Sequence, residues 1–273
     1  MAGRLAVVFP GQGTSGEQAG GEAWELARGR AAGDEVPYQL RVFAASMDLF
    51  SGLRGSGVWP DVVSGHSLGE YAAAVAAGSL GLEDAVELVA ERDRLMTLAS
   101  RKNPGVMVAV VGVDPGEVSR AAEETEGVVV AANFNSPRQT VISGEPGAVE
   151  AAAGKVGGRK IRLNVAGAFH SPLMREAALE MEGLLAGVTF RDPEVPMISG
   201  ADGSVLERGE EVRLALQRQM LSPVRWVAVV ERMVELGVRE VVEAGEDGTL
   251  TRMLRDFRRK DLRGRRAGEV ISA

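Results

Sequence analysis

Cysteine is absent from this chain of 273 residues, and histidine occurs only twice, at His66 and His170. The missing cysteines exclude disulfide bonds, thiolate nucleophiles and cysteine-ligated metals. Two histidines leave little material for a metal site, so we expect no bound metal. We also expect no bound cofactor. Any covalent catalysis by this chain therefore needs a nucleophile other than cysteine.

Long apolar runs and a secretory signal are lacking too. No stretch of about 18 or more uncharged apolar residues occurs, and Met1 to Arg4 leads directly into an expected strand. We therefore expect a cytoplasmic protein that does not contact the membrane. The formal net charge of -7 argues against nucleic acid as the main partner.

Apolar patterning predicts an α/β body. Buried strands are expected at 5–9, just before Gly65, and at 238–243, because these runs are apolar throughout or nearly so. Residues 14–34 predict a loop with at most a short helix at 23–30. Further helices are expected at 36–53, 68–77, 82–98, 173–186, 210–221, 224–236 and 248–257.

The stretch 104–166 has a different rhythm from the rest of the chain. It predicts strand 106–111, helix 115–124, strands 128–132 and 139–143, helix 146–156 and strand 160–163. This β-α-β-β-α-β order is typical of a ferredoxin-like unit. We therefore expect a small subdomain at 104–166 beside a body formed by 1–103 and 167–273, with the site in the cleft between them.

A nucleophile elbow is indicated by Gly65-His66-Ser67-Leu68-Gly69, where an apolar run meets an alanine-rich helical segment. The two glycines allow a tight strand-to-helix turn that leaves the Ser67 hydroxyl exposed. The positive end of the following helix would then stabilise an oxyanion beside the hydroxyl. The alternative is an ordinary glycine-flanked turn.

A serine nucleophile needs a base, and histidine is the usual one. His66 directly precedes Ser67, so its side chain should leave the turn in another direction and pack or hydrogen-bond nearby. His170 is then the remaining candidate base. A carboxylate or a main-chain carbonyl could orient its imidazole, and the sequence pattern does not say which.

Arg92 lies in the helix expected at 82–98, with apolar residues three and four positions away on both sides. Its side chain either snorkels from the edge of the core or points into a cavity.

Residues 252–266 hold eight Arg or Lys and two Asp, a formal charge of +6. Such a segment is usually a solvated end.

Six motifs resemble, in order and spacing, those of the malonyl-CoA:acyl carrier protein transacylase family. They are Phe9-Pro10-Gly11-Gln12-Gly13, Gly65-His66-Ser67-Leu68-Gly69-Glu70-Tyr71, Glu91-Arg92, Asn133-Phe134-Asn135-Ser136-Pro137, Gly167-Ala168-Phe169-His170-Ser171-Pro172-Leu173-Met174 and Ser222-Pro223-Val224-Arg225-Trp226. The resemblance spans nearly the whole chain. It implies an α/β-hydrolase-like body with an inserted ferredoxin-like subdomain.

The resemblance also implies roles for single residues. Ser67 would take the acyl group and His170 would act as its base, oriented by the main-chain carbonyl of Gln219. The backbone amides of Gln12 and Leu68 would form the oxyanion hole. Arg92 would pair with the malonyl carboxylate.

The implied reaction is a ping-pong transfer of malonyl from malonyl-CoA to the thiol of holo-acyl carrier protein, for fatty acid or polyketide synthesis. Phe169 resembles the malonyl-selective form of its motif. We expect a monomer, and the basic segment 252–266 is the densest candidate for docking an acidic carrier protein.

Two departures from the family keep other functions open. Residues 14–60 are shorter than usual, with Thr14-Ser15 where Ser-Gln is expected, and Glu246-Asp247 falls where Gly-Pro-Gly is expected, in a loop that should approach the site. The alternatives are an acyl hydrolase that edits carrier-bound groups and a non-catalytic carrier-binding module. Arg92 disfavours the first, and the presence of both Ser67 and His170 disfavours the second.

Overall fold

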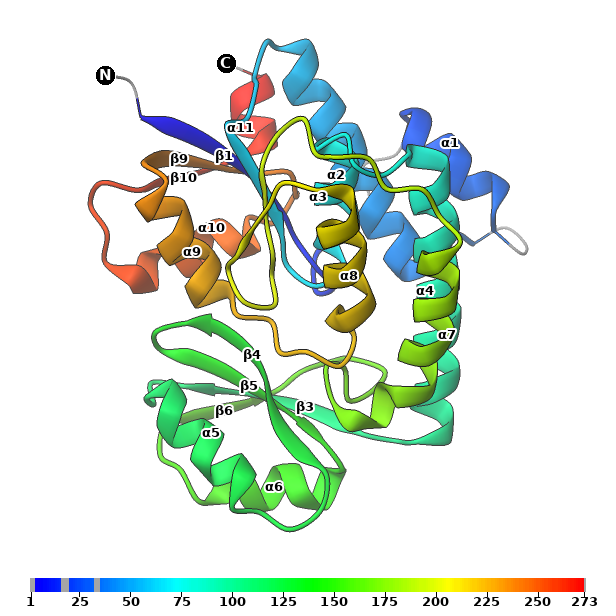
Figure 1. Cartoon of the computed structure of the whole chain (residues 1–273). Helices are drawn as coiled ribbons and strands as arrows, with labels where there is room; N and C mark the ends of the chain where they lie inside the picture. The colour runs from blue at the N-terminus through cyan, green and yellow to red at the C-terminus, as the bar shows by residue number, and fades with distance from the viewer. Residues whose placement is uncertain (1–2, 16–19, 32–34, 273) are drawn as a thin grey trace.

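A computed structural model of the chain describes residues 3–15, 20–31 and 35–272. These residues form a mixed α/β fold with two separate sheets, one of six strands and one of four (Figure 1). The six-stranded sheet lies in the body, and the four-stranded sheet forms the small subdomain at the lower end of the view. The predicted fold class is therefore confirmed.

The body sheet has the strand order β10-β9-β1-β2-β7-β8. All its pairs are parallel except β7 with β8. Its central strands are buried on both faces, which explains their nearly continuous apolar sequences. The strands are β1 (Arg4–Phe9), β2 (Val62–Gly65), β7 (Met197–Ile198), β8 (Val205–Leu206), β9 (Val238–Glu243) and β10 (Arg263–Arg266).

Helices cover both faces of this sheet and form an apolar core on each face. Alternate residues of β1 point into one core and then the other. Val7 and Phe9 pack with the large cluster under α2, α3 and α4, whereas Ala6 and Val8 pack with the cluster under α9. The body helices are α1 (Glu22–Gly29), α2 (Tyr38–Gly55), α3 (Gly69–Ala76), α4 (Leu82–Lys102), α7 (Arg175–Ala186), α8 (Gly209–Gln219), α9 (Trp226–Glu235), α10 (Thr249–Met253) and α11 (Ala267–Ile271).

The small subdomain has the predicted β-α-β-β-α-β order. Its antiparallel sheet runs β4-β5-β3-β6, and two helices pack on one face around a third apolar cluster. Its elements are β3 (Val106–Val111), α5 (Pro115–Glu123), β4 (Val129–Ser136), β5 (Gln139–Gly144), α6 (Pro146–Gly154) and β6 (Arg159–Arg162). The domain bounds at 103/104 and 166/167 stay a prediction.

Backbone hydrogen bonds join the subdomain to the body. Val224 N donates to Ala132 O at 2.8 Å, and Phe134 N donates to Val224 O at 2.7 Å. The segment before α9 therefore pairs with β4 as a short parallel bridge. This link fixes β4 beside the carboxyl ends of the body strands.

The C-terminal segment differs most from expectation. The helix predicted at 248–257 ends as α-helix at Met253 and continues as the 3₁₀ turn η2 (Leu254–Phe257), and β10 and α11 were not predicted. A second 3₁₀ turn, η1 (Pro172–Met174), precedes α7.

In the described part of the chain, no helix has both the length and the apolar character needed to cross a membrane.

Candidate active site

The expected elbow is present between β2 and α3. Strand β2 ends at Gly65, helix α3 begins at Gly69, and Ser67 between them has a φ of 52°, in the left-handed region. A side chain at Gly65 would overlap the backbone of Gly69, and one at Gly69 would overlap Phe9 O. Both glycines are therefore required for the turn, and the strained backbone at Ser67 is held by its surroundings.

His170 lies against the elbow serine. Its Nε2 is 2.7 Å from Ser67 Oγ, although the two residues are 103 positions apart. His170 also has a left-handed backbone, with a φ of 56°. Such conformations are uncommon for residues other than glycine and concentrate at functional sites. The structure thus brings together the two residues that the sequence proposed as nucleophile and base.

Two main-chain carbonyls face the other nitrogen of His170. Nδ1 is 3.1 Å from Gln219 O and 3.0 Å from Ser222 O, so Nδ1 carries the proton and donates it, leaving Nε2 free to accept from Ser67. Burial, and then the nearby Arg92 charge, lower the pKa of His170 to about 4. The imidazole is therefore neutral near pH 7, as a general base must be.

The guanidinium of Arg92 is buried beside the serine, with only 1% of the residue exposed. Its Nη2 lies 3.2 Å from Ser67 Oγ and 3.3 Å from Gln219 Oε1, and its Nη1 donates to Gln39 Oε1. All three oxygens belong to uncharged side chains, and Arg92 Nε is buried with no hydrogen-bond partner. Arg92 therefore points inward at the nucleophile and does not snorkel.

Gln219 connects these groups through its side chain as well. Its Nε2 donates to Ser67 O at 2.8 Å and to Glu70 Oε1 at 3.0 Å, and the other oxygen of Glu70 accepts from Gly200 N at 3.0 Å. Burial raises the pKa of Glu70 to about 7. Arg92 can only donate hydrogen bonds, so the side-chain oxygen of Gln219, and not its nitrogen, must face the guanidinium.

The sequence did not assign roles to Glu70, Gln39 or the Ser222 carbonyl. Glu70 had a readable signal, since it is the one acidic residue in an otherwise apolar or small helix start. Gln39 and the Ser222 carbonyl had none, because they reach the site only through the packing of α2 and of the segment after α8.

Of the two proposed oxyanion-hole donors, one is next to Ser67 in sequence and the other lines the cavity that contains Ser67. Leu68 follows Ser67 at the start of α3, and Gln12 lines the same cavity from the loop after β1. Neither backbone N–H donates a hydrogen bond to another described residue. Two backbone donors with no protein acceptor beside a nucleophile can bind a developing oxyanion.

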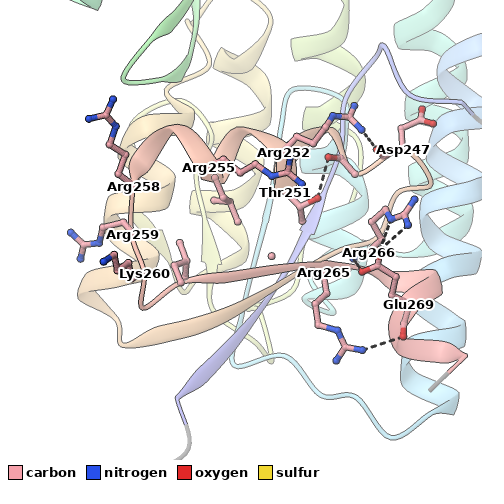
Figure 2. Close-up of a pocket in the computed structure, with 14 residues that line it drawn as sticks. Asp247, Thr251, Arg252, Arg255, Arg258, Arg259, Lys260, Arg265, Arg266 and Glu269 are labelled. Atoms are coloured by element: carbon pink, nitrogen blue, oxygen red, sulfur yellow. Dashed lines mark hydrogen bonds and ion pairs between the residues drawn. The ribbon is translucent and has the colours of Figure 1, made fainter.

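A cavity of about 340 Å³ contains the Ser67–His170 pair. Residues from both the body and the small subdomain line it, as the predicted interlobe cleft requires. A larger hollow of about 620 Å³ lies between α10 and β10 and contains neither residue (Figure 2).

His66 lines the same cavity, but its ring is hydrogen-bonded to a residue other than Ser67. Its Nε2 is 2.9 Å from Asn135 Oδ1 in β4, so its partner lies in the small subdomain and not nearby in sequence. Glu246 and Asp247 do not line the Ser67 cavity; both accept hydrogen bonds from Ser15. Within the described residues, no group of three or more His, Asp or Glu could hold a metal ion.

Comparisons with known proteins agree with this geometry. The family model "Acyl transferase domain" matches residues 33–268. The malonyl CoA-acyl carrier protein transacylase of Escherichia coli (strain K12) is 41% identical over 198 residues, an alignment that covers 70% of this chain and 64% of that protein.

Solved structures share the whole fold. The malonyl CoA-acyl carrier protein transacylase of Coxiella burnetii has a TM-score of 0.89 and 30% identity, covering 99% of this chain and 96% of that one. A malonyl-transacylase solved in complex with a holo type II polyketide synthase acyl-carrier protein has a TM-score of 0.86 and 30% identity, covering 96% and 95%. With most of its length matched by the family model and its site assembled as described, this chain belongs to the acyl transferase domain family.

Proposed function

We propose that this chain transfers the malonyl group from malonyl-CoA to the phosphopantetheine thiol of an acyl carrier protein, supplying units for fatty acid or polyketide synthesis. The observation that carries the proposal is the buried Arg92 guanidinium, which donates hydrogen bonds to uncharged side chains and lies 3.2 Å from the nucleophile. A buried cation with an unused N–H suits a substrate that brings its own carboxylate. The solved carrier complex of a relative supports the choice of acceptor.

The first half-reaction forms a malonyl ester on Ser67. Ser67 Oγ attacks the thioester carbonyl while His170 Nε2 takes its proton. The backbone N–H groups of Gln12 and Leu68 bind the oxyanion of the tetrahedral intermediate. The intermediate collapses, and His170 gives the proton to the departing coenzyme A sulfur.

The second half-reaction repeats these steps with the carrier thiol. His170 takes the thiol proton, the sulfur attacks the ester carbonyl, and the proton returns to Ser67 Oγ as the malonyl thioester leaves. Throughout, the Gln219 carbonyl holds the His170 ring in place through Nδ1. In this scheme malonyl-CoA and the holo-carrier protein are both substrates, and no bound cofactor takes part.

Arg92 selects the acyl group in this account. The malonyl carboxylate replaces neutral acceptors with a charged one, forming a pair of charge-assisted hydrogen bonds in a site shielded from water. An acetyl group offers no such partner.

A cytoplasmic location and a monomeric state stay predictions.

Intact-mass measurements test the proposal. The protein is incubated with malonyl-CoA, acetyl-CoA or methylmalonyl-CoA, with and without a holo-carrier protein. A transferase shows malonyl-protein that is discharged only when the carrier is added. Discharge to free malonate without the carrier indicates a hydrolase, and absence of any acyl-protein indicates a binding module; either result contradicts the proposal.

A further inference from the structure

The larger hollow between α10 and β10 is strongly basic. Seven of the fourteen residues that line its volume of about 620 Å³ are Arg or Lys, and two are acidic. We call this hollow the basic groove. The whole chain has a formal net charge of -7, so this positive cluster contrasts with the negative charge of the rest of the protein.

The chain is folded back on itself to build the groove. After η2, Arg258 adopts a left-handed conformation with a φ of 52°, and the chain returns as β10 along β9. Gly264 in β10 lets that strand approach α10 closely, because a Cβ there would lie only 3.1 Å from Thr251 Cβ. The arginines of both segments therefore line one concavity (Figure 2).

Several of these cations are already engaged. Arg266 pairs with Glu269 at 2.7 Å, Arg265 lies 3.4 Å from Glu240, and Arg252 donates to the Asp247 carbonyl. In contrast, the exposed side chains of Arg255, Arg258 and Lys260 have no hydrogen bond or ion pair with any described residue. Unpaired cations that line one hollow can bind a polyanion.

The basic groove adjoins the Ser67 cavity across one short helix. Thr249, Leu250 and Met253 line the cavity, whereas Thr251 and Leu254 line the groove. Met253 and Leu254 are consecutive, so the linings of the two hollows are adjacent at the carboxyl end of α10. A hydrogen bond of 2.7 Å from Ser136 Oγ to Asp256 ties this border to β4 in the small subdomain.

We propose that the basic groove binds the phosphate groups of the coenzyme A substrate, a proposal that rests on the function proposed above. Coenzyme A carries a diphosphate and a 3′-phosphate at the end opposite its thioester, joined by an extended pantetheine chain. A ligand with its thioester at Ser67 therefore needs an anion site outside the cavity and next to it. Guanidinium groups match phosphate oxygens in geometry and charge.

The concave shape favours this small polyanion over the carrier protein. A carrier protein presents a convex surface and a single phosphodiester, whereas the groove is a hollow with cations on more than one wall. The groove should therefore contribute to the affinity for coenzyme A thioesters and leave catalysis at Ser67 unchanged.

The test compares two triple variants of equal charge change. The first is Arg255→Gln, Arg258→Gln and Lys260→Gln in the groove. The control is Arg28→Gln, Arg120→Gln and Lys155→Gln, all exposed and outside both hollows. Calorimetry measures binding of coenzyme A, and quenched-flow kinetics measure acylation by malonyl-CoA and by malonyl-pantetheine, which lacks the nucleotide phosphates.

We expect the groove variant to weaken coenzyme A binding roughly fivefold to fiftyfold, from three exposed charge contacts. The kcat/KM for malonyl-CoA should fall in parallel, while malonyl-pantetheine and the control variant show no change. The affinity of the parent for coenzyme A should also fall with added salt.

Unchanged coenzyme A binding, or an equal loss for malonyl-pantetheine, overturns the proposal. A groove variant that is acylated normally but discharges slowly to the carrier protein also overturns it, since the groove then serves the carrier. If the parent transfers no malonyl group, the proposed function fails, and the calorimetry with coenzyme A still decides the groove. Melting temperatures of both variants, compared with the parent, check that the fold is intact.

Discussion

The guanidinium of Arg92 is almost fully buried, yet the side-chain oxygens that accept its hydrogen bonds are uncharged. Burying a cation without a paired anion costs free energy, and here Nε is left without any acceptor. The protein tolerates this arrangement because Gln39 and Gln219 supply neutral acceptors. In the proposed function, a malonyl carboxylate beside Ser67 would supply the charged partner that Arg92 lacks.

Replacing Arg92 by alanine should change selectivity more than general activity. Arg92→Ala should lower malonyl transfer to Ser67 by about tenfold to a thousandfold, because the substrate carboxylate loses its charged partner. Acylation by acetyl-CoA should stay equal or improve. Rates for both thioesters are measured in the parent, in Arg92→Ala, and in Arg94→Ala as the control, since Arg94 is exposed and pairs with Glu91. A parallel loss for both substrates, with a lower melting temperature, would mean that Arg92 is structural.

The two histidines provide a matched pair for testing the base. His170→Ala should slow acylation by about a hundredfold or more, the usual scale for a general base. His66→Gln should have a much smaller effect, because His66 binds Asn135 and not Ser67. Single-turnover acylation by malonyl-CoA compares the two. Equal losses in both variants would remove His170 from its proposed role.

Glu70 should make the protein less stable as pH rises. Its pKa is raised from 4.5 in the unfolded chain to about 7 in the fold, so the folded state binds the proton more tightly. The contribution of this proton to the free energy of unfolding is fully present below pH 4.5 and is lost as pH rises through about 7. Glu70→Gln lacks this proton equilibrium.

The free energy of unfolding of Glu70→Gln should therefore rise relative to the parent by about 3 kcal/mol across that window. Urea unfolding at several pH values measures the difference. The control is Glu117→Gln, which removes an exposed carboxyl on α5 of the small subdomain and should give the same difference from the parent at every pH. A parent–variant difference independent of pH would show that Glu70 does not titrate in this window.

The contact between Ser67 and His170 was predictable because the chemistry of a serine nucleophile limits the choice of partner. A chain with no cysteine and two histidines, one of them next to the serine, leaves Ser67 and His170 as the candidate pair. Main-chain groups are harder to predict, because every residue has a carbonyl. The Ser222 carbonyl that faces His170 would be present whatever side chain position 222 carried. The Gln219 carbonyl was reached only through the family resemblance.

The elbow itself depends on the lack of side chains at two positions. Gly65→Ala places a Cβ against the backbone of Gly69, where no flexible side chain can move aside. The turn must shift, and we expect a loss of about 1–3 kcal/mol or more in stability, as for other overpacked sites, together with loss of acylation. Chemical unfolding and intact-mass labelling measure the two effects.

Gly147 in α6 is the matched control for this substitution. A Cβ at Gly147 meets nothing within 4 Å, so Gly147→Ala should fold and acylate as the parent does. If Gly65→Ala also behaves as the parent, the tight approach of the elbow to α3 is not required.

Elements with strong apolar patterns were predicted well, and edge elements were not. Strands β1, β2 and β9 are buried in the middle of the sheet, and their sequences show it. Strand β10 reads Arg-Gly-Arg-Arg, with no apolar alternation, because it lies at the sheet edge and pairs through its backbone with β9 alone. Charged edge strands are common, since charge discourages pairing between molecules.

The molecule as a whole places two different hollows on either side of α10. One joins the body to the small subdomain and holds Ser67, and the other is basic. The order of elements predicted both sheets, because βαβ units and the β-α-β-β-α-β order restrict the topology. The basic groove could not be predicted, since it needs the chain to turn at Arg258 and pair as β10. From sequence, residues 252–266 indicated a solvated charged end or a docking segment for an acidic carrier protein, and not a hollow.

The central claim is that this chain carries the malonyl group on Ser67. The direct test is mass spectrometry of peptides from the parent and from Ser67→Ala after brief incubation with malonyl-CoA. We predict one malonyl ester in the parent, on the peptide containing Ser67, which disappears when holo-carrier protein is added, and no ester in Ser67→Ala. Malonyl label on another residue, or label that persists in Ser67→Ala, would contradict the account.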